Sequence, residues 1–386
     1  MTIEELKAAF ESAYSHNAEA VYFAPGRVNL IGEHTDYNGG AVFPCALSFG
    51  TYLLLRKNGG NSINFLSLNQ QEISSLGLDQ LTKPLAKSWV NYPLGVFAQF
   101  LKRGVAITEG FDLLIWGNVP NGAGLSSSAS LEVVTAFALN DQLGSNFNRT
   151  ELAKIGQKAE HEFAFVNCGI MDQFASANGA KDMAIHLNCD TLDFELVPVK
   201  LEGVKILISN THSPHKLDSG AYNQRVAECQ LAVKQLNKVR PLKYLAELTE
   251  AEFQSIESAI KDKTAHKRAR HVVGEVQRTS DAVKALKAGD LTLFGKLMNE
   301  SHKSLRDDYE VTGIQLDTMA EEAWKIEGVI GSRMTGGGFG GCTVSLVKDE
   351  AIDTFIEKVG AAYTAKTGLT PEFYIAEIGN GACKID

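Results

Sequence analysis

A glycine-broken, serine-dense segment, PNGAGLSSSAS at 120–130, runs directly into a helical pattern. Leu131, Val134 and Ala138 are spaced for one buried face of that helix. Glycine lets the backbone turn sharply and come close to a ligand, and the first N–H groups of a helix are unpaired at the positive end of its dipole. The segment therefore predicts an anion site suited to phosphate. The alternative is a Ser/Gly turn that caps an ordinary helix.

The chain has 386 residues, which exceeds the size at which single hydrophobic cores stop growing. We therefore expect two domains, 1–200 and 201–386. The 37 basic and 46 acidic residues give a net charge of −9, which argues against a nucleic-acid or membrane-surface partner. No apolar run has the length of a transmembrane helix. The six cysteines show no CxxC spacing, which indicates reduced thiols, and we expect a cytoplasmic protein.

The pattern of elements predicts an α+β fold with layered sheets and helices. Strand-like runs such as TYLLLRK and FDLLIWG alternate with helical patterns at 88–103, 126–140 and 149–165. From about 219 to 328 the pattern is mainly helical. The end of the chain has a strand, a glycine loop, a strand, a helix and a strand. This mixture does not suggest regular βαβ winding.

The motif GRVNLIGEHTDYN at 26–38 places Arg27, Glu33, His34 and Asp36 on one loop after a strand. Charged and amide side chains this close together can bind several hydroxyl groups, as a sugar requires. The alternative is a polar turn with routine surface pairs.

The segment EHEFAFVNCGIMDQF at 160–174 holds two candidate acids. Asp172 has apolar neighbours and is a plausible base if a cation such as Arg27 stabilises its charged form. Its alternative role is to cap the next helix. Glu160 lies in a helical pattern and could equally be a solvated helix residue.

A third glycine loop, MTGGGFGGCTVSLV at 334–347, has five glycines at 336–341. Such a run usually signals close backbone approach or unusual dihedrals. Other phosphate binders are disfavoured, because the chain has no GxxxxGK[ST], no protein-kinase HRD or DFG set, and no GxGxxG in a βαβ context.

Two lesser features have ordinary interpretations. The basic run HKRARH at 266–271 predicts a solvated helix face. Trp89 and Tyr92 in SWVNY are typical of a helix core, and stacking on an adenine ring is a second hypothesis.

The three motifs together resemble the GHMP family of small-molecule kinases, and they occur in family order along nearly the whole chain. GRVNLIGEHTDY is similar to the signature of the members that phosphorylate galactose, whereas the other two loops are shared across the family. The resemblance implies an N-terminal α+β domain, a C-terminal ferredoxin-like α+β domain and an active site between them. It implies ATP-dependent phosphorylation of the anomeric hydroxyl of α-D-galactose, with ATP and Mg²⁺ as cofactors.

The resemblance also implies roles for individual residues. The positions that match the family's sugar contacts are Arg27, Glu33, His34, Asp36, Gly169, Asp172 and Tyr222. Asp172 matches the catalytic base and Arg27 its cationic partner. The positions that match the ATP-binding loop are Gly122, Ala123, Gly124, Leu125, Ser126, Ser127 and Ser128, to which we add Trp89 as the adenine contact. Ser127 or Ser128, with Glu160, match the magnesium ligands.

Two alternative functions remain open. One is a related sugar kinase with a shifted substrate. The other is a non-catalytic sensor that binds galactose and ATP, although the complete LSSSAS segment, Arg27 and Asp172 disfavour it. We expect a monomer, because no exposed apolar stripe stands out.

Overall fold

A computed structural model of the chain describes residues 1–120, 124–213 and 219–385. In the first half the elements are α1 Ile3–Tyr14, β1 Ala20–Asn29, β2 Ala41–Val42, β3 Pro44–Lys57, β4 Ser62–Ser67, β5 Glu72–Gly77, α2 Asn91–Lys102, β6 Phe111–Gly117, α3 Ser127–Leu143, α4 Arg149–Ala159, α5 Met171–Asn178, β7 Met183–Asn188 and β8 Phe194–Pro198. In the second half they are β9 Val204–Asn210, α6 Ser219–Leu236, α7 Glu250–Ile256, α8 Lys263–Lys287, α9 Leu291–Ser304, α10 Gly313–Ala323, β10 Val329–Thr335, β11 Cys342–Lys348, α11 Ile352–Thr367, β12 Glu372–Ala376 and β13 Cys383–Lys384.

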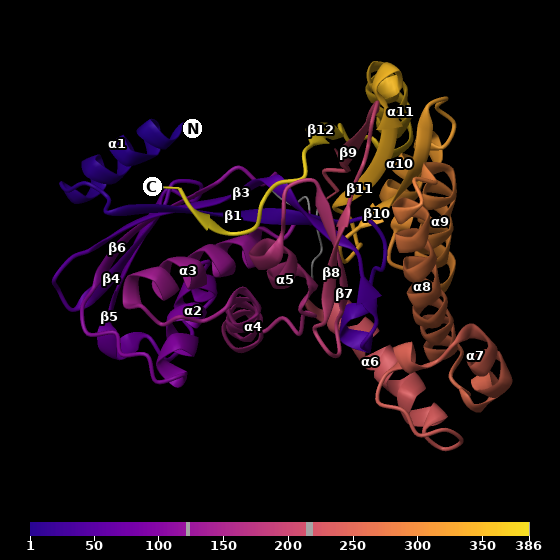
Figure 1. The fold of residues 1–386 in the computed structure, drawn as a ribbon, viewed down its shortest axis with the longest axis horizontal. Helices are drawn as coiled ribbons and strands as arrows, with labels where there is room; N and C mark the ends of the chain where they lie inside the picture. Colours follow the sequence, from indigo (N-terminus) through magenta and orange to yellow (C-terminus); the bar gives the residue numbers. More distant parts are fainter. Residues whose placement is uncertain (121–123, 214–218, 386) are drawn as a thin grey trace.

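The first sheet has six strands in the order β13-β1-β3-β6-β4-β5. Helices α2 to α5 lie against one face and α1 lies against the other (Figure 1). Side chains of β3 alternate between these layers, as strand geometry requires. Leu53 and Leu55 pack into the core with the larger group of helices, whereas Leu54 packs with Leu6 and Phe10 of α1. The two-residue period therefore sets which face each helix covers.

The second sheet has the order β10-β11-β9-β12, and all its neighbouring strands are antiparallel. Helices separate β9 from β10, and α11 separates β11 from β12. This is the βαββαβ arrangement of a ferredoxin-like fold, which confirms the expected class. A small third sheet, β2-β7-β8, lies beside the first.

The two large sheets share a core where the long strands β1 and β3 reach the second half (Figure 1). Val28 of β1 and Cys45 of β3 pack with Ile206 of β9 and Val344 of β11. The opposite face of the second sheet packs Leu207 against α10 and α11. The loop that follows β1 is consequently held between the two halves.

The basic run at 266–271 is not a solvated face, so that prediction is wrong. It lies in α8, where Arg268 and His271 are buried at a spacing of three, Arg270 is exposed, and His266 and Lys267 are partly exposed. Arg268 is compensated by ion pairs to Glu228 at 2.7 Å and Glu310 at 2.9 Å. Opposite charges on neighbouring elements let this half of the run enter the core.

Two further observations concern the chain as a whole. No helix among the described residues is long and apolar enough to cross a membrane. The division near residue 200 falls between β8 and β9 and stays a prediction, because β13 returns to pair with β1 of the first sheet.

Candidate active site

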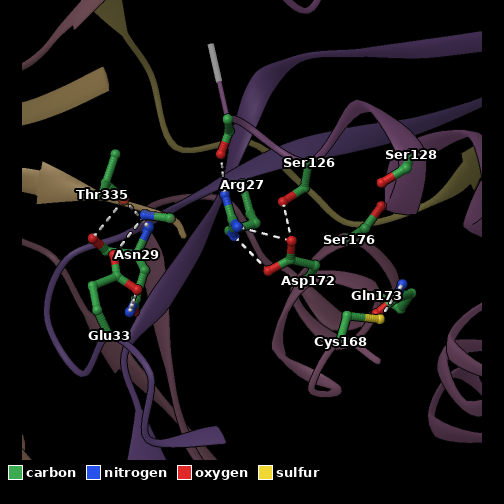
Figure 2. A network of polar contacts seen from close by, with 12 residues as sticks. Arg27, Asn29, Glu33, Ser126, Ser128, Cys168, Asp172, Gln173, Ser176 and Thr335 are labelled. Atoms are coloured by element: carbon green, nitrogen blue, oxygen red, sulfur yellow. Dashed lines mark hydrogen bonds and ion pairs between the residues drawn. The ribbon is translucent and has the colours of Figure 1, made fainter. Parts of the chain in front are cut away.

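The motif at 26–38 and the segment at 160–174 meet at an ion pair between Arg27 and Asp172 (Figure 2). Arg27 lies on β1 and is only 3% exposed. Its Nε and Nη2 donate to the two carboxylate oxygens of Asp172, each at 2.8 Å, and its Nη1 donates to the carbonyl of Gly124 at 2.9 Å. Ser126, directly before α3, donates its hydroxyl to Asp172 Oδ2 at 2.5 Å. The carboxylate is therefore fixed by three donors.

The structure decides the alternatives for the two acids. Asp172 is the second residue of α5, whose cap residue is Ile170, and its carboxylate binds Arg27 and Ser126 rather than capping the helix. Glu160 is 7% exposed, so it is not a solvated helix residue. It begins a short π-helical turn after α4, and Ser128 donates to its Oε1 at 3.2 Å.

A cavity of about 360 Å³ opens beside this ion pair. The predicted site residues that line it are Arg27, Glu33, His34, Asp36, Gly124, Leu125, Ser126, Ser127, Ser128, Glu160, Gly169, Asp172 and Tyr222. A second cavity of about 220 Å³ is lined by Trp89 and shares Tyr92, Ser127 and Ser128 with the first. Gly122 and Ala123 lie outside the described residues.

Some of the lining was not singled out from the sequence. Those residues are Pro120, Val166, Cys168 and Met171, whereas Gly336 and Gly337 belong to the third glycine loop, which the sequence did single out. Tyr92, interpreted as helix core, lines both cavities. The signal for the missed residues was present, because 166, 168 and 171 lie inside the segment 160–174 and 120 begins the segment 120–130.

Glu33 joins the motif at 26–38 to the third glycine loop. It is 1% exposed, and its Oε1 accepts hydrogen bonds from the Gly336 N–H at 2.8 Å and from Arg333 at 3.2 Å. Asn29 donates to its Oε2 at 2.8 Å (Figure 2). Gly336 itself has a φ of +86°, which a side chain rarely adopts. Glu33 thus holds the glycine loop at the cavity wall.

Glu160 belongs to a cluster of buried polar groups behind Ser128. Gln173 donates its Nε2 to Glu160 Oε2 at 2.7 Å and to Glu132 Oε2 at 2.9 Å. The thiol of Cys168 donates to Glu160 at 3.4 Å. Burial, with a smaller contribution from Asp172, raises the pKa of Glu160 to about 7. Two acids lie here without an ion pair of their own among the described residues, so the cluster favours a bound cation.

Gly169 leaves room for Asp36. A β-carbon at position 169 would lie 1.7 Å from Asp36 Oδ2, far inside contact distance. We expect Gly169→Ala to lower kcat/KM for galactose by about 10- to 100-fold, because Asp36 must leave its place. The KM for ATP should stay near the wild-type value. Steady-state kinetics with each substrate varied will check this.

The matched control is Gly60→Ala, in the turn between β3 and β4, where the nearest contact is the Asn58 side chain at 3.2 Å. That variant should keep wild-type kinetics. A Gly169→Ala enzyme with unchanged kcat/KM would show that Asp36 has no fixed role at the cavity.

Burial, and then the nearby Asp172, raise the pKa of Asp36 to about 7. The folded state therefore binds a proton more tightly than the unfolded state, whose pKa lies near 3.9, and stability falls as pH rises between these values. We expect Asp36→Asn to melt roughly 2–4 °C above the wild type at pH 8. The gain should shrink as pH falls towards 4, and the galactose KM should rise. Thermal melts of the free proteins across this range test the sign, and a variant less stable than wild type at pH 8 would contradict it.

Comparison with known protein families gives three matches along the chain. Residues 8–57 match the galactokinase galactose-binding signature, residues 91–180 the N-terminal domain of GHMP kinases, and residues 282–365 their C-terminal domain. The fold and the site thus define a GHMP kinase.

Comparison with individual proteins identifies the branch of the GHMP kinases to which the chain is most similar among those compared. Galactokinase from Clostridium beijerinckii is 51% identical over 99% of both chains, and that from Bacillus subtilis is 46% identical over 98% of both. The crystal structure of Lactococcus lactis galactokinase complexed with galactose has a TM-score of 0.97 and 43% identity, with full coverage of both chains. Mevalonate kinase from Methanococcus jannaschii, 18% identical with a TM-score of 0.68, covers 93% of this chain and 98% of its own and shares the fold. The chain belongs to the galactokinase family.

Proposed function

We propose that the 360 Å³ cavity is where the γ-phosphate of ATP passes to the anomeric hydroxyl of α-D-galactose, giving galactose 1-phosphate and ADP. The observation that carries this proposal is the Arg27–Asp172 fork in the wall of a cavity that also contains the start of α3. Phosphoryl transfer asks a protein mainly for alignment and neutralisation of charge. The cavity supplies groups for both.

The sugar binds on the side of the cavity that the motif at 26–38 forms. Asp36, His34 and Tyr222 line it together with Gly169, and they offer acceptors and donors for several hydroxyl groups. Arg27 and Glu33 are committed to contacts within the protein, so their role toward the sugar is to hold the cavity wall.

Asp172 acts as the general base. Its Oδ2 accepts hydrogen bonds from Arg27 and Ser126, whereas its Oδ1 accepts only one, from Arg27, among the described residues. An ionised carboxylate oxygen can accept two. Oδ1 is consequently the atom that receives the proton of the anomeric hydroxyl.

ATP takes the other side, with its phosphates at the start of α3 and its adenine in the cavity beside Trp89. Ser127 and Ser128 line both cavities, so they lie where the adenine site joins the phosphate site. The first N–H groups of α3 and its dipole favour the phosphate charge.

The residues present fit Mg²⁺. Glu160 and the hydroxyl of Ser128 lie 3.2 Å apart at the cavity wall, with Ser127 beside them, and no group of three acidic, His or Cys ligands occurs in the described part of the chain. Mg²⁺ is usually held by one or two carboxylates together with substrate phosphates and water. When bound, the ion neutralises charge on the β- and γ-phosphates.

The test is ADP release with ATP and magnesium, measured on galactose, N-acetylgalactosamine, galacturonate and arabinose. Galactose should give the highest kcat/KM. A stronger reaction with another sugar would establish a shifted substrate. Binding of galactose and ATP without ADP release would establish a sensor and overturn the proposal.

We also propose a cytoplasmic monomer with domains 1–200 and 201–386. All six cysteines are free, which suits a reducing compartment. The large apolar side chains that are exposed, such as Ile73, Phe165 and Ile314, come from separate elements. Light scattering on the purified protein measures the oligomeric state.

A further inference from the structure

His34 lines the sugar side of the cavity, and one of its ring nitrogens has no partner. It is 4% exposed and has a φ of +62°, which is uncommon for a residue with a side chain. Its Nδ1 lies 2.9 Å from the hydroxyl of Tyr37. Its Nε2 is buried and makes no hydrogen bond of normal geometry among the described residues, although the backbone of Gly337 lies close enough to act on the pKa of the ring. A buried ring nitrogen without a partner is costly, so it points to a ligand.

The Tyr37 hydroxyl is the start of a buried chain of hydrogen bonds. It lies 2.7 Å from the hydroxyl of Tyr309, which lies 3.1 Å from the thiol of Cys229. Tyr309 and Cys229 are 0% and 1% exposed, and they come from the turn after α9 and from α6. Three separate parts of the fold therefore meet behind His34.

Ring packing holds the same group in place. The His34 ring lies 4.6 Å from the Tyr309 ring and 5.8 Å from the Tyr222 ring, centroid to centroid. The imidazole can therefore keep its position when a single hydroxyl is removed. What the hydroxyl of Tyr37 controls is the proton on the ring.

The direction of the chain follows from the acid–base character of its members. Burial lowers the pKa of His34 well below its usual range, so the ring is neutral and carries one proton. A phenol is a good donor and a poor acceptor, whereas an unprotonated imidazole nitrogen is a good acceptor. The favoured order is therefore Cys229 to Tyr309, Tyr309 to Tyr37, and Tyr37 to Nδ1 of His34. This order leaves the proton on Nε2.

We propose that Tyr37 is a positioning residue that fixes His34 in the Nε2–H tautomer, so that it donates a hydrogen bond to an oxygen of the sugar, with Tyr309 as the neighbour that contacts the Tyr37 hydroxyl. The proposal rests on the proposed function, because it places galactose beside His34. It also assigns a role to the tyrosine of the EHTDY segment, whose hydroxyl faces away from solvent into this chain.

The tautomer can be measured without any substrate. In protein labelled with ¹⁵N-histidine, long-range proton–nitrogen spectra distinguish Nδ1–H from Nε2–H, and His34→Gln assigns the His34 signals among the nine histidines. We expect Nε2–H in the wild type and a mixture of both tautomers in Tyr37→Phe. In Tyr309→Phe the Tyr37 hydroxyl remains, so Nε2–H should persist. An Nδ1–H ring in the wild type, or no change in Tyr37→Phe, would overturn the proposal.

Kinetics provide the second readout. Tyr37→Phe should raise the KM for galactose about tenfold with kcat within threefold and the KM for ATP unchanged, and Tyr309→Phe should raise it less than threefold. The matched control is Tyr14→Phe, which also loses a partly buried hydroxyl, one bonded to the Leu113 carbonyl at 2.9 Å in the packing of α1 on the first sheet. The control should leave the galactose KM unchanged. A Tyr37→Phe enzyme with an unchanged galactose KM would refute the positioning role.

The two proposals fail in different ways. If the sugar panel gives no ADP release with galactose, the proposed function fails, while the spectra of the free protein still report the tautomer. If galactose is phosphorylated but Tyr37→Phe keeps the wild-type tautomer and KM, only the positioning role fails.

Discussion

Asp172→Asn is expected to lower kcat by about 10³-fold, because it removes the carboxylate that we propose as acceptor of the sugar hydroxyl proton. Asparagine has nearly the same shape, but its amide group would face a guanidinium donor of Arg27, so one of the two 2.8 Å contacts is lost. The contacts proposed between the sugar and Asp36, His34 and Tyr222 remain. The dissociation constant for galactose should therefore change by less than about threefold.

Single-turnover kinetics and calorimetric titration with galactose separate the two quantities. Asp79→Asn is the matched control, since Asp79 is exposed and does not line either cavity of the site. Near-normal turnover in Asp172→Asn would remove the base assignment. A large loss of galactose affinity would instead show that Asp172 serves mainly to bind the sugar.

Arg27→Lys is expected to lower kcat by about 100-fold although the charge is kept. A lysine has one compact ammonium group and cannot reproduce the planar fork that meets both Asp172 oxygens and the Gly124 carbonyl together. The carboxylate would turn, and the Oδ1 lone pair would no longer face the sugar hydroxyl. The loss should appear in kcat more than in either KM.

Arg56→Lys provides the comparison. Arg56 makes one contact to Asp112, at 3.5 Å, in the first sheet, which a lysine can replace. Its kinetics should match the wild type. An Arg27→Lys enzyme that keeps more than about half of the wild-type kcat would show that charge, rather than the fork geometry, is what position 27 supplies.

The architecture was largely predictable because its determinants are local. Short apolar runs marked β3 and β6, and the stretch from about 219 to 328 was recognised as mainly helical. The two edge strands of the first sheet, β5 and β13, escaped notice for a physical reason. β5 is mostly exposed, with Ile73 64% exposed, and β13 has two residues, so neither buries enough side chains to leave a pattern.

The site was predictable as a set of motifs but not as a set of contacts. Arg27, Asp172 and Ser126 come from three segments, and their shared hydrogen bonds depend on the packing of β1, α3 and α5. The burial of Arg268 likewise depends on acids about 40 residues away in the sequence. Charge patterns within one helix do not reveal such partners.

The hydrogen bonds of Glu33 have a consequence for the order in which the enzyme folds. They join positions 303 and 300 residues apart, to Gly336 and Arg333. Contacts of such separation close late, because the loop entropy is lost before the contact is made. A nascent chain that has emerged only as far as α9 already contains most of the helices. It still lacks Arg333 and Gly336, whose hydrogen bonds to Glu33 shape the cavity wall. Refolding should therefore restore circular dichroism well before it restores turnover.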